Sequence, residues 1–161
     1  MRRGQDGFTL VELLISLAIS GLIVGVLATF ISQTLNLTTG GNDRLLVTDD
    51  LRTAGAWLTQ DGQMAHLASS TAVASTLVLS WTDVYSGVNV PYQSTYAVSG
   101  SELQRGYAVR GATPVTITVA RHIASPNGVS FSIGGDMLTA TITATSGQTT
   151  ESRSIQVGSR R

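Results

Sequence analysis

A single carboxylate, Glu12, lies inside an apolar run near the start of the chain. Between Phe8 and Ile31 it is the only ionisable side chain. These 24 residues are enough for one helix to cross the hydrocarbon core of a bilayer. A carboxylate in such a segment is costly, so it predicts a functional site. The alternative is a side chain that reaches the membrane edge and has no partner.

The residues before this run form a short basic leader. Arg2 and Arg3 favour a cytoplasmic N-terminus, with the rest of the chain on the other side of the membrane. A cleaved signal peptide has an apolar stretch of about 7–15 residues followed by a small-residue cleavage site. The run here is longer, and no A-x-A site follows it. The segment is therefore predicted to be a membrane anchor rather than a signal peptide.

The string from Gly7 to Ile19, GFTLVELLISLAI, resembles the N-terminal signature of type IV pilins, minor pilins and type II secretion pseudopilins. The resemblance implies that a prepilin peptidase cuts after Gly7 and N-methylates the new first residue, Phe8. Glu12 is then the fifth mature residue, where the family has its carboxylate. By this resemblance Glu12 neutralises the Phe8 amine of a neighbouring subunit. Pairing within one chain is the competing geometry, since either pairing offsets two charges that are costly alone.

Two glycines in the apolar run, Gly21 and Gly25, are separated by one helical turn. Small residues at this spacing let two membrane helices approach closely, so they are candidate helix-packing residues. The alternative is that glycine is simply common in membrane helices.

A second helical pattern follows the apolar run. Asp43 resembles an N-cap, and the double glycine Gly40-Gly41 predicts a break or bend just before it. One apolar stripe then recurs at helical spacing: Val47, Leu51, Ala54, Leu58 and Ala65. These observations predict an amphipathic helix over residues 43–66 that packs on a sheet.

The remainder of the chain has the two-residue period of strands. Strands are expected at Thr76–Trp81, Ser94–Ser99, Glu102–Arg105, Val115–Val119, Val129–Ile133, Met137–Thr143 and Arg153–Val157. Hairpin turns are expected at Gly100, Gly135 and Gly147, which implies antiparallel pairing. Residues Asp83–Tyr92 are predicted to be the longest irregular stretch, an ordinary surface loop in preference to a binding loop.

No arrangement of residues in the sequence predicts catalysis. The chain has no cysteine, so thiolate chemistry, disulfides and Cys-metal sites are excluded. His66 and His122 are predicted to be ordinary surface or capping residues. Asp61 is expected on the solvated side of the second helix. We expect no enzyme activity, no cofactor and no metal site, and the zero formal net charge offers no basic field for nucleic acid.

These patterns and the resemblance together predict an α+β, pilin-like fold. It consists of a long N-terminal helix, transmembrane and then amphipathic, packed on an antiparallel β-sheet domain. The expected parts are a leader (1–7), a transmembrane and assembly helix (8–37), an amphipathic helix (43–66) and an extracytoplasmic β-rich domain (71–161).

The resemblance implies a structural subunit of a type IV pilus-like filament or a type II secretion pseudopilus, with a J- or W-type minor pilin or pseudopilin favoured. The implied partners are other pilin or pseudopilin subunits, the prepilin peptidase and an inner-membrane assembly platform. Nucleic acid would be a partner only in a DNA-uptake (competence) pilus. The implied localisation is a single-pass inner-membrane protein with a cytoplasmic N-terminus, and then a cell-surface or periplasmic filament. The alternative is a membrane-anchored β-domain that binds a ligand or mediates adhesion and never polymerises.

Overall fold

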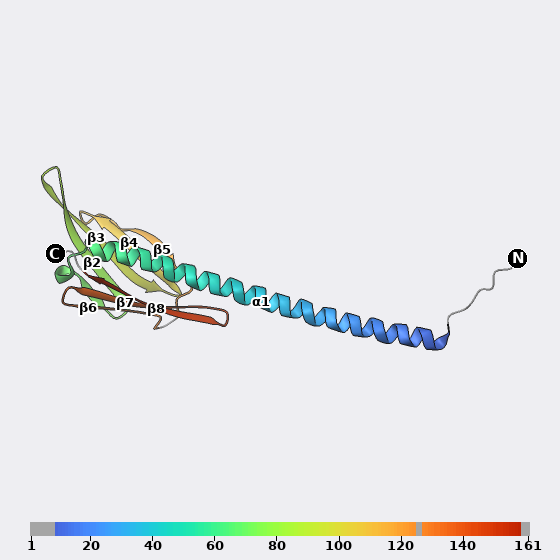
Figure 1. Ribbon diagram of the computed structural model, residues 1–161. Helices are drawn as coiled ribbons and strands as arrows, with labels where there is room; N and C mark the ends of the chain where they lie inside the picture. The colour runs from blue at the N-terminus through green and yellow to red at the C-terminus, as the bar shows by residue number, and fades with distance from the viewer. Residues whose placement is uncertain (1–8, 125–126, 159–161) are drawn as a thin grey trace. The chain divides into compact units, whose positions relative to one another are not determined.

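The computed structural model describes residues 9–124 and 127–158 (Figure 1). Within them the chain forms one long helix, α1 (Leu10–Met64), a short 3-10 helix, η1 (Leu67–Ser69), and eight strands. The strands make two antiparallel sheets. This confirms the predicted α+β class. By its internal contacts the chain divides into two units, one that ends at Gly41 and one that begins at Asn42.

The first unit is helical from Leu10 onward and presents its apolar side chains to the surroundings. The large apolar residues from Leu10 to Leu37 are all exposed. Five hydroxyl side chains donate to the carbonyl four residues earlier at 2.9–3.0 Å: Thr29, Ser32, Thr34, Thr38 and Thr39. Because a bilayer core holds no water to satisfy polar groups, internal bonding of this kind suits a segment that enters lipid.

The break expected at Gly40-Gly41 is absent, and the assignment of Asp43 as an N-cap is wrong. The helix continues from Leu10 to Met64. A helical glycine costs only about 1 kcal/mol relative to alanine, which the flanking helix and its packing outweigh. The Asp43 carboxylate instead accepts a hydrogen bond from Ser146 Oγ at 2.9 Å. An added Cβ on Gly147 would collide with this carboxylate.

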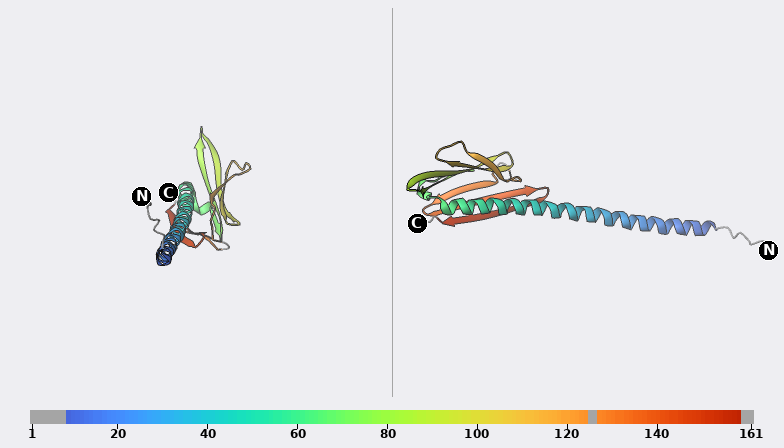
Figure 2. Two further views of the ribbon diagram at one scale, coloured as in Figure 1. Left: turned by 90° about the vertical axis from the view of Figure 1, so that its right-hand side faces the viewer. Right: turned by 90° about the horizontal axis from the view of Figure 1, so that it is seen from above.

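The two sheets are built from consecutive hairpins. The first has the order β1 (Thr71–Val73), β2 (Thr76–Tyr85), β3 (Val88–Ser99), β4 (Glu102–Val109) and β5 (Val115–Ala120). The second has the order β6 (Val129–Gly134), β7 (Met137–Ser146) and β8 (Thr149–Gly158). The part of α1 that belongs to the second unit lies along both sheets (Figures 1 and 2).

The predicted strands are all present, and each is longer than expected. The predicted turns at Gly100, Gly135 and Gly147 are confirmed, because each glycine has a positive φ of 54–62° between paired strands. Strand β1 was not predicted.

The irregular stretch expected at Asp83–Tyr92 is wrong. These residues continue the β2–β3 hairpin, with Asp83 paired to Val90, around a tight turn at Ser86-Gly87. Pro91 misled the prediction because proline removes a ladder donor. The Pro91 carbonyl accepts a hydrogen bond from the Arg110 N–H, so the backbone nitrogen of Pro91 faces the same side, toward β4. Strand β4 ends at Val109, and the missing N–H therefore leaves no strand partner unsatisfied.

The core lies between the amphipathic part of α1 and the sheets. The predicted stripe is confirmed as core packing, since Val47, Leu51, Ala54 and Leu58 are at most 4% exposed. They pack with fully buried residues of both sheets, among them Leu77, Leu79, Tyr96, Leu103, Leu138 and Ile142. Gly62 allows α1 to lie close against β8, because a Cβ there would be 3.0 Å from Val157 Cγ1.

Candidate functional site

The N-terminal end of α1 is organised by Thr9 and Glu12. The Thr9 backbone N–H donates to Glu12 Oε2 at 3.0 Å, and the Thr9 hydroxyl donates to the same oxygen at 2.9 Å. In return, the Glu12 N–H donates to Thr9 Oγ1 at 3.3 Å. This reciprocal arrangement is a capping box, which satisfies N–H groups that a helix start otherwise leaves free. It fixes the carboxylate at the first turn of the helix.

Both bonds from Thr9 end on the same carboxylate oxygen. The other oxygen, Oε1, takes no hydrogen bond from any residue that the structure describes. Glu12 is also exposed. The carboxylate therefore keeps an accepting oxygen for a further donor.

Of the other residues that the sequence predicts to be functional in this segment, the structure describes Gly21 and Gly25. Gly7 and Phe8 lie outside the described residues. Gly21 and Gly25 lie in α1, and a Cβ built on either would have no described atom within 4 Å apart from its own stretch of helix backbone. The surface around both glycines is thus open for another helix.

The helix that carries these residues is long and apolar enough to cross a membrane. Its apolar window holds no buried residue. Exposed leucine, isoleucine and valine side chains at this density would be unfavourable in water, at roughly 25 cal/mol for each Å² of apolar surface. Lipid or other apolar helices would stabilise such a segment better than water does.

A polar cluster that the sequence did not predict lies at the other end of α1. Asp61 was expected on the solvated side, but its side chain is fully buried. Arg105 Nε donates to Asp61 Oδ2 at 2.7 Å and Arg105 Nη2 to Asp61 Oδ1 at 2.8 Å. The Tyr96 hydroxyl donates to Asp61 Oδ2 at 2.6 Å. The cluster joins α1 to β3 and β4.

One signal for this cluster was present in the sequence. Asp61 follows Leu58 by three residues and precedes Ala65 by four, so it continues the spacing of the apolar stripe. A carboxylate on a buried helix face needs a cation and hydrogen-bond donors, because burial without them is very costly. The sequence did not indicate which residues supply them.

The electrostatics of the cluster follow from burial and charge. Loss of solvent raises the pKa of Tyr96, and the negative charge of Asp61 raises it further. The hydrogen bond to Asp61 raises the pKa of Arg105. All the donors thus remain protonated at neutral pH, which is the arrangement of a structural clamp rather than of a proton-transfer site.

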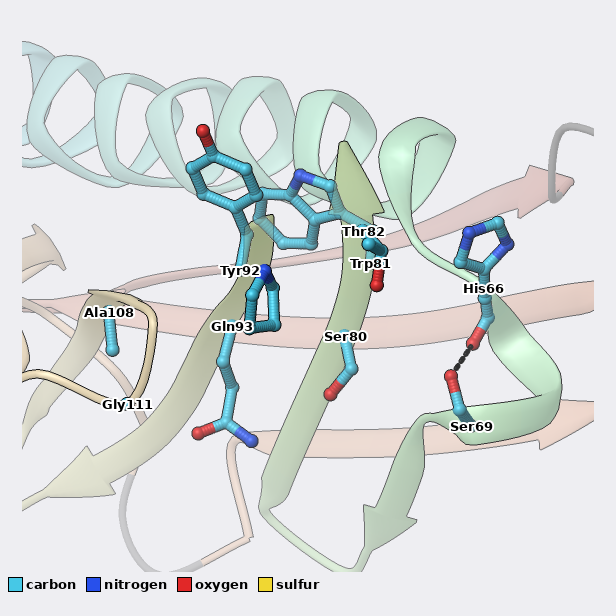
Figure 3. Close-up of a pocket in the computed structure, with 10 residues that line it drawn as sticks. His66, Ser69, Ser80, Trp81, Thr82, Tyr92, Gln93, Ala108 and Gly111 are labelled. Carbon is cyan, nitrogen blue, oxygen red and sulfur yellow. Dashed lines mark hydrogen bonds between the residues drawn. The ribbon is translucent and has the colours of Figure 1, made fainter. Parts of the chain in front are cut away.

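The two histidines lie apart from this cluster. His122 Nδ1 is 2.7 Å from Asp50 Oδ2, and the His122 N–H donates to the same oxygen at 2.9 Å. His66 lines a pocket of about 240 Å³ with Ser69 and Ser80 (Figure 3). Ser69 Oγ donates to the His66 carbonyl rather than to its ring. No carboxylate among the described residues lines this pocket to orient the imidazole.

Comparison with known proteins gives one match. Residues 2–28 match the family model described as the Prokaryotic N-terminal methylation motif. No curated protein and no solved structure matches the chain. The motif is the N-terminal signal of type IV pilins and pseudopilins, and it points to a structural protein rather than an enzyme. With the apolar helix that follows, it fits the membrane-anchored precursor of such a protein, a substrate of prepilin peptidase.

Proposed function

We propose that the chain is a structural subunit of a type IV pilus-like filament or a type II secretion pseudopilus. In this proposal it is cleaved after Gly7, N-methylated at Phe8 and assembled through its hydrophobic helix. The observation that carries the proposal is the methylation motif over residues 2–28, in front of an apolar helix with unburied side chains. Such a helix is stable in a membrane. It is also stable when it packs against the apolar helices of other subunits.

The state of Glu12 supports a pairing role in assembly. Its carboxylate is held at the first helical turn by Thr9, and its second oxygen is free of described donors. Cleavage after Gly7 would create a cationic amine at Phe8. We propose that the free oxygen of Glu12 accepts this amine from a neighbouring subunit, which would set the axial register. Two charges in a low-dielectric setting then offset one another.

The open surface at Gly21 and Gly25 supports close packing between helices of adjacent subunits. The partners that follow are other pilin or pseudopilin subunits, the prepilin peptidase and an inner-membrane assembly platform. The precursor would span the inner membrane once with its N-terminus in the cytoplasm, and the β-rich unit would lie outside it. The continuous strand-rich domain without cysteine is compatible with a minor subunit.

The first experiment is intact mass spectrometry with N-terminal sequencing of the chain from native membranes. The expected product starts at N-methylated Phe8. A chain that still starts at Met1, in cells with an active processing peptidase, would overturn the proposal. A cut beyond Ile31 would do the same, because it would release the domain from its helix.

The role of Glu12 is tested by Glu12→Ala, with Ser16→Ala one turn further along the same helix as the matched control. We expect Glu12→Ala to insert into the membrane normally but to be missing from the sheared filament fraction, whereas Ser16→Ala assembles. A membrane-anchored β-domain that never polymerises predicts no difference between the two variants. Equal assembly of both variants would exclude the pairing.

A further inference from the structure

One side of the amphipathic part of α1 carries a groove of about 440 Å³ with aromatic walls. Trp81 and Tyr92 stack with ring centroids 5.7 Å apart, and Tyr107 lies 6.2 Å from each of them. The lining also includes three residues of α1, one of β2 and one of β4: Trp57, Gln60, Met64, Asp83 and Arg105. Aromatic faces beside a carboxylate form a surface that favours a cation.

The same rings already bind one guanidinium from within the chain. Arg105 Cζ lies 4.4 Å from the centroid of the Trp57 ring and 5.0 Å from that of Tyr107. Its charge is matched by Asp61, at 2.7 Å. The carboxylate of Asp83, by contrast, is exposed and forms no ion pair or hydrogen bond with a side chain of any described residue. The groove therefore has one carboxylate whose charge no described residue matches.

A second groove along α1, of about 470 Å³, shares Gln60 with the first and is basic. Arg52 of α1 and Arg153 of β8 both line it, together with neutral residues, and no carboxylate does. Both arginines are exposed, and neither forms an ion pair with a described residue. Two guanidinium groups in one groove repel each other, and an acidic or aromatic group bound there would offset this repulsion.

We propose that these two grooves are the complementary halves of a contact between copies of this chain. An arginine of the basic groove, Arg52 or Arg153, enters the aromatic groove of the next copy, stacks on the rings and pairs with Asp83. The aromatic groove is lined by α1 and the first sheet, and the basic groove by α1 and β8. A contact that joins two different surfaces repeats from copy to copy and builds an open assembly.

This inference deepens the proposed function, because it names a lateral contact between the β-rich units of subunits that the helices hold together. Such a contact can be weak by itself. Subunits tethered in one membrane meet at high effective concentration, so a single stacked ion pair is enough to bias their arrangement.

The test uses the full chain in native membranes, which the absence of cysteine makes straightforward. Ala56→Cys lies in the basic groove and Met64→Cys in the aromatic groove. The double variant is treated with a short bismaleimide. We expect a ladder of dimers, trimers and longer products, because a contact between unlike surfaces continues along the assembly. Each single variant should give at most dimers.

The charges are then tested in this double-cysteine chain. We expect Asp83→Asn to weaken the ladder about two- to fivefold, the upper part of the range for one exposed ion pair. Arg52→Gln combined with Arg153→Gln should have a similar effect. Arg121→Gln is the matched control, since Arg121 is exposed and lines neither groove.

A ladder that Asp83→Asn does not weaken, a ladder that Arg121→Gln weakens equally, products no larger than dimers, or no product at all would each overturn the inference. The proposed function is assessed separately in the same cells, from N-methylated Phe8 in the sheared fraction. A methylated, assembled chain without the ladder would refute the lateral contact and leave the proposed function standing. A ladder in membranes without methylated Phe8 would support the contact and refute the proposed function.

Discussion

Substitution of Arg105 by methionine isolates a buried carboxylate. The Asp61 side chain is fully buried, and that of Arg105 is 9% exposed. Arg105→Met removes both guanidinium hydrogen bonds but keeps the apolar stem of the side chain. Asp61 then retains only the Tyr96 hydroxyl among its described donors. Removal of one partner of a buried pair costs about 3–5 kcal/mol, so we expect the free energy of unfolding to fall by that amount.

The cost should come from the unpaired charge and not from the loss of a favourable bond. If so, Asp61→Leu combined with Arg105→Met will recover most of the stability, because no charge stays buried. The Tyr96 hydroxyl would still lack its acceptor, at about 1–3 kcal/mol. Addition of Tyr96→Phe removes that penalty, and we expect the triple variant to be at least as stable as the natural chain.

The assay is urea unfolding of the full chain in detergent micelles, followed by tryptophan fluorescence. Trp57 reports on the site directly, since its ring lies 4.4 Å from the Arg105 guanidinium carbon. Arg153→Met is the matched control: an exposed arginine without an ion pair should change stability by no more than about 0.5 kcal/mol. A cost below about 1 kcal/mol for Arg105→Met would refute the reasoning, because it would mean that water reaches the carboxylate.

Three further predictions concern the same unit and can be measured by unfolding of the full chain in micelles. Gly62→Ala should destabilise by about 1–3 kcal/mol, because its Cβ would press on β8 at 3.0 Å, whereas Gly21→Ala should leave unfolding of the domain unchanged. Gly147→Ala should destabilise by at least about 1 kcal/mol, since φ is +54° and the new methyl group would meet Asp43. Burial raises the pKa of Tyr96 above its ordinary value of 10.0, so the unfolded chain loses this proton first. The contribution of Tyr96 to stability should therefore be constant below about pH 10 and fall above it by up to about 1.4 kcal/mol per pH unit, and Tyr96→Phe should remove that contribution.

Each of these expectations can fail in a definite way. Equal effects of Gly62→Ala and Gly21→Ala would show that helix propensity, not contact with β8, sets the cost. An unchanged Gly147→Ala chain would mean that the β7–β8 turn moves freely away from α1. A Tyr96→Phe chain with the same alkaline slope as the natural chain would mean that other groups account for the pH dependence.

The fold class and the N-terminal signal could be predicted from sequence because both are local. Hydropathy over 24 residues, one carboxylate and the string around Gly7 need no information from distant parts of the chain. The apolar stripe from Val47 and the glycine turns are also short-range patterns. Each pattern depends only on neighbouring residues, and both the stripe and the turns are present in the folded structure.

The errors arose where tertiary context outweighed a local preference. Gly40-Gly41 favours a helix end, yet α1 continues through it because the helix on either side is long and the second part is anchored in the core. Gly87 and Pro91 favour a loop, yet paired residues on both arms extend the hairpin to a two-residue turn. The two helical glycines cost about 2 kcal/mol relative to alanine, which the flanking helix and the core outweigh. The missing N–H of Pro91 leaves no strand partner unsatisfied.

The sequence by itself determined the apolar helix, which is long enough to cross a membrane, and its processing signal. It also determined the two-residue period of side chains that is typical of antiparallel strands. Only the tertiary structure decided the clamp at Asp61 and the two grooves beside α1. Tyr96 and Arg105 are 35 and 44 residues from Asp61, and Arg52 meets Arg153 only through the packing of α1 on β8. No short-range pattern in the sequence indicates which of these distant charged residues will pair. Which of them are matched within the chain, and which remain free for another copy, depends on the folded arrangement alone.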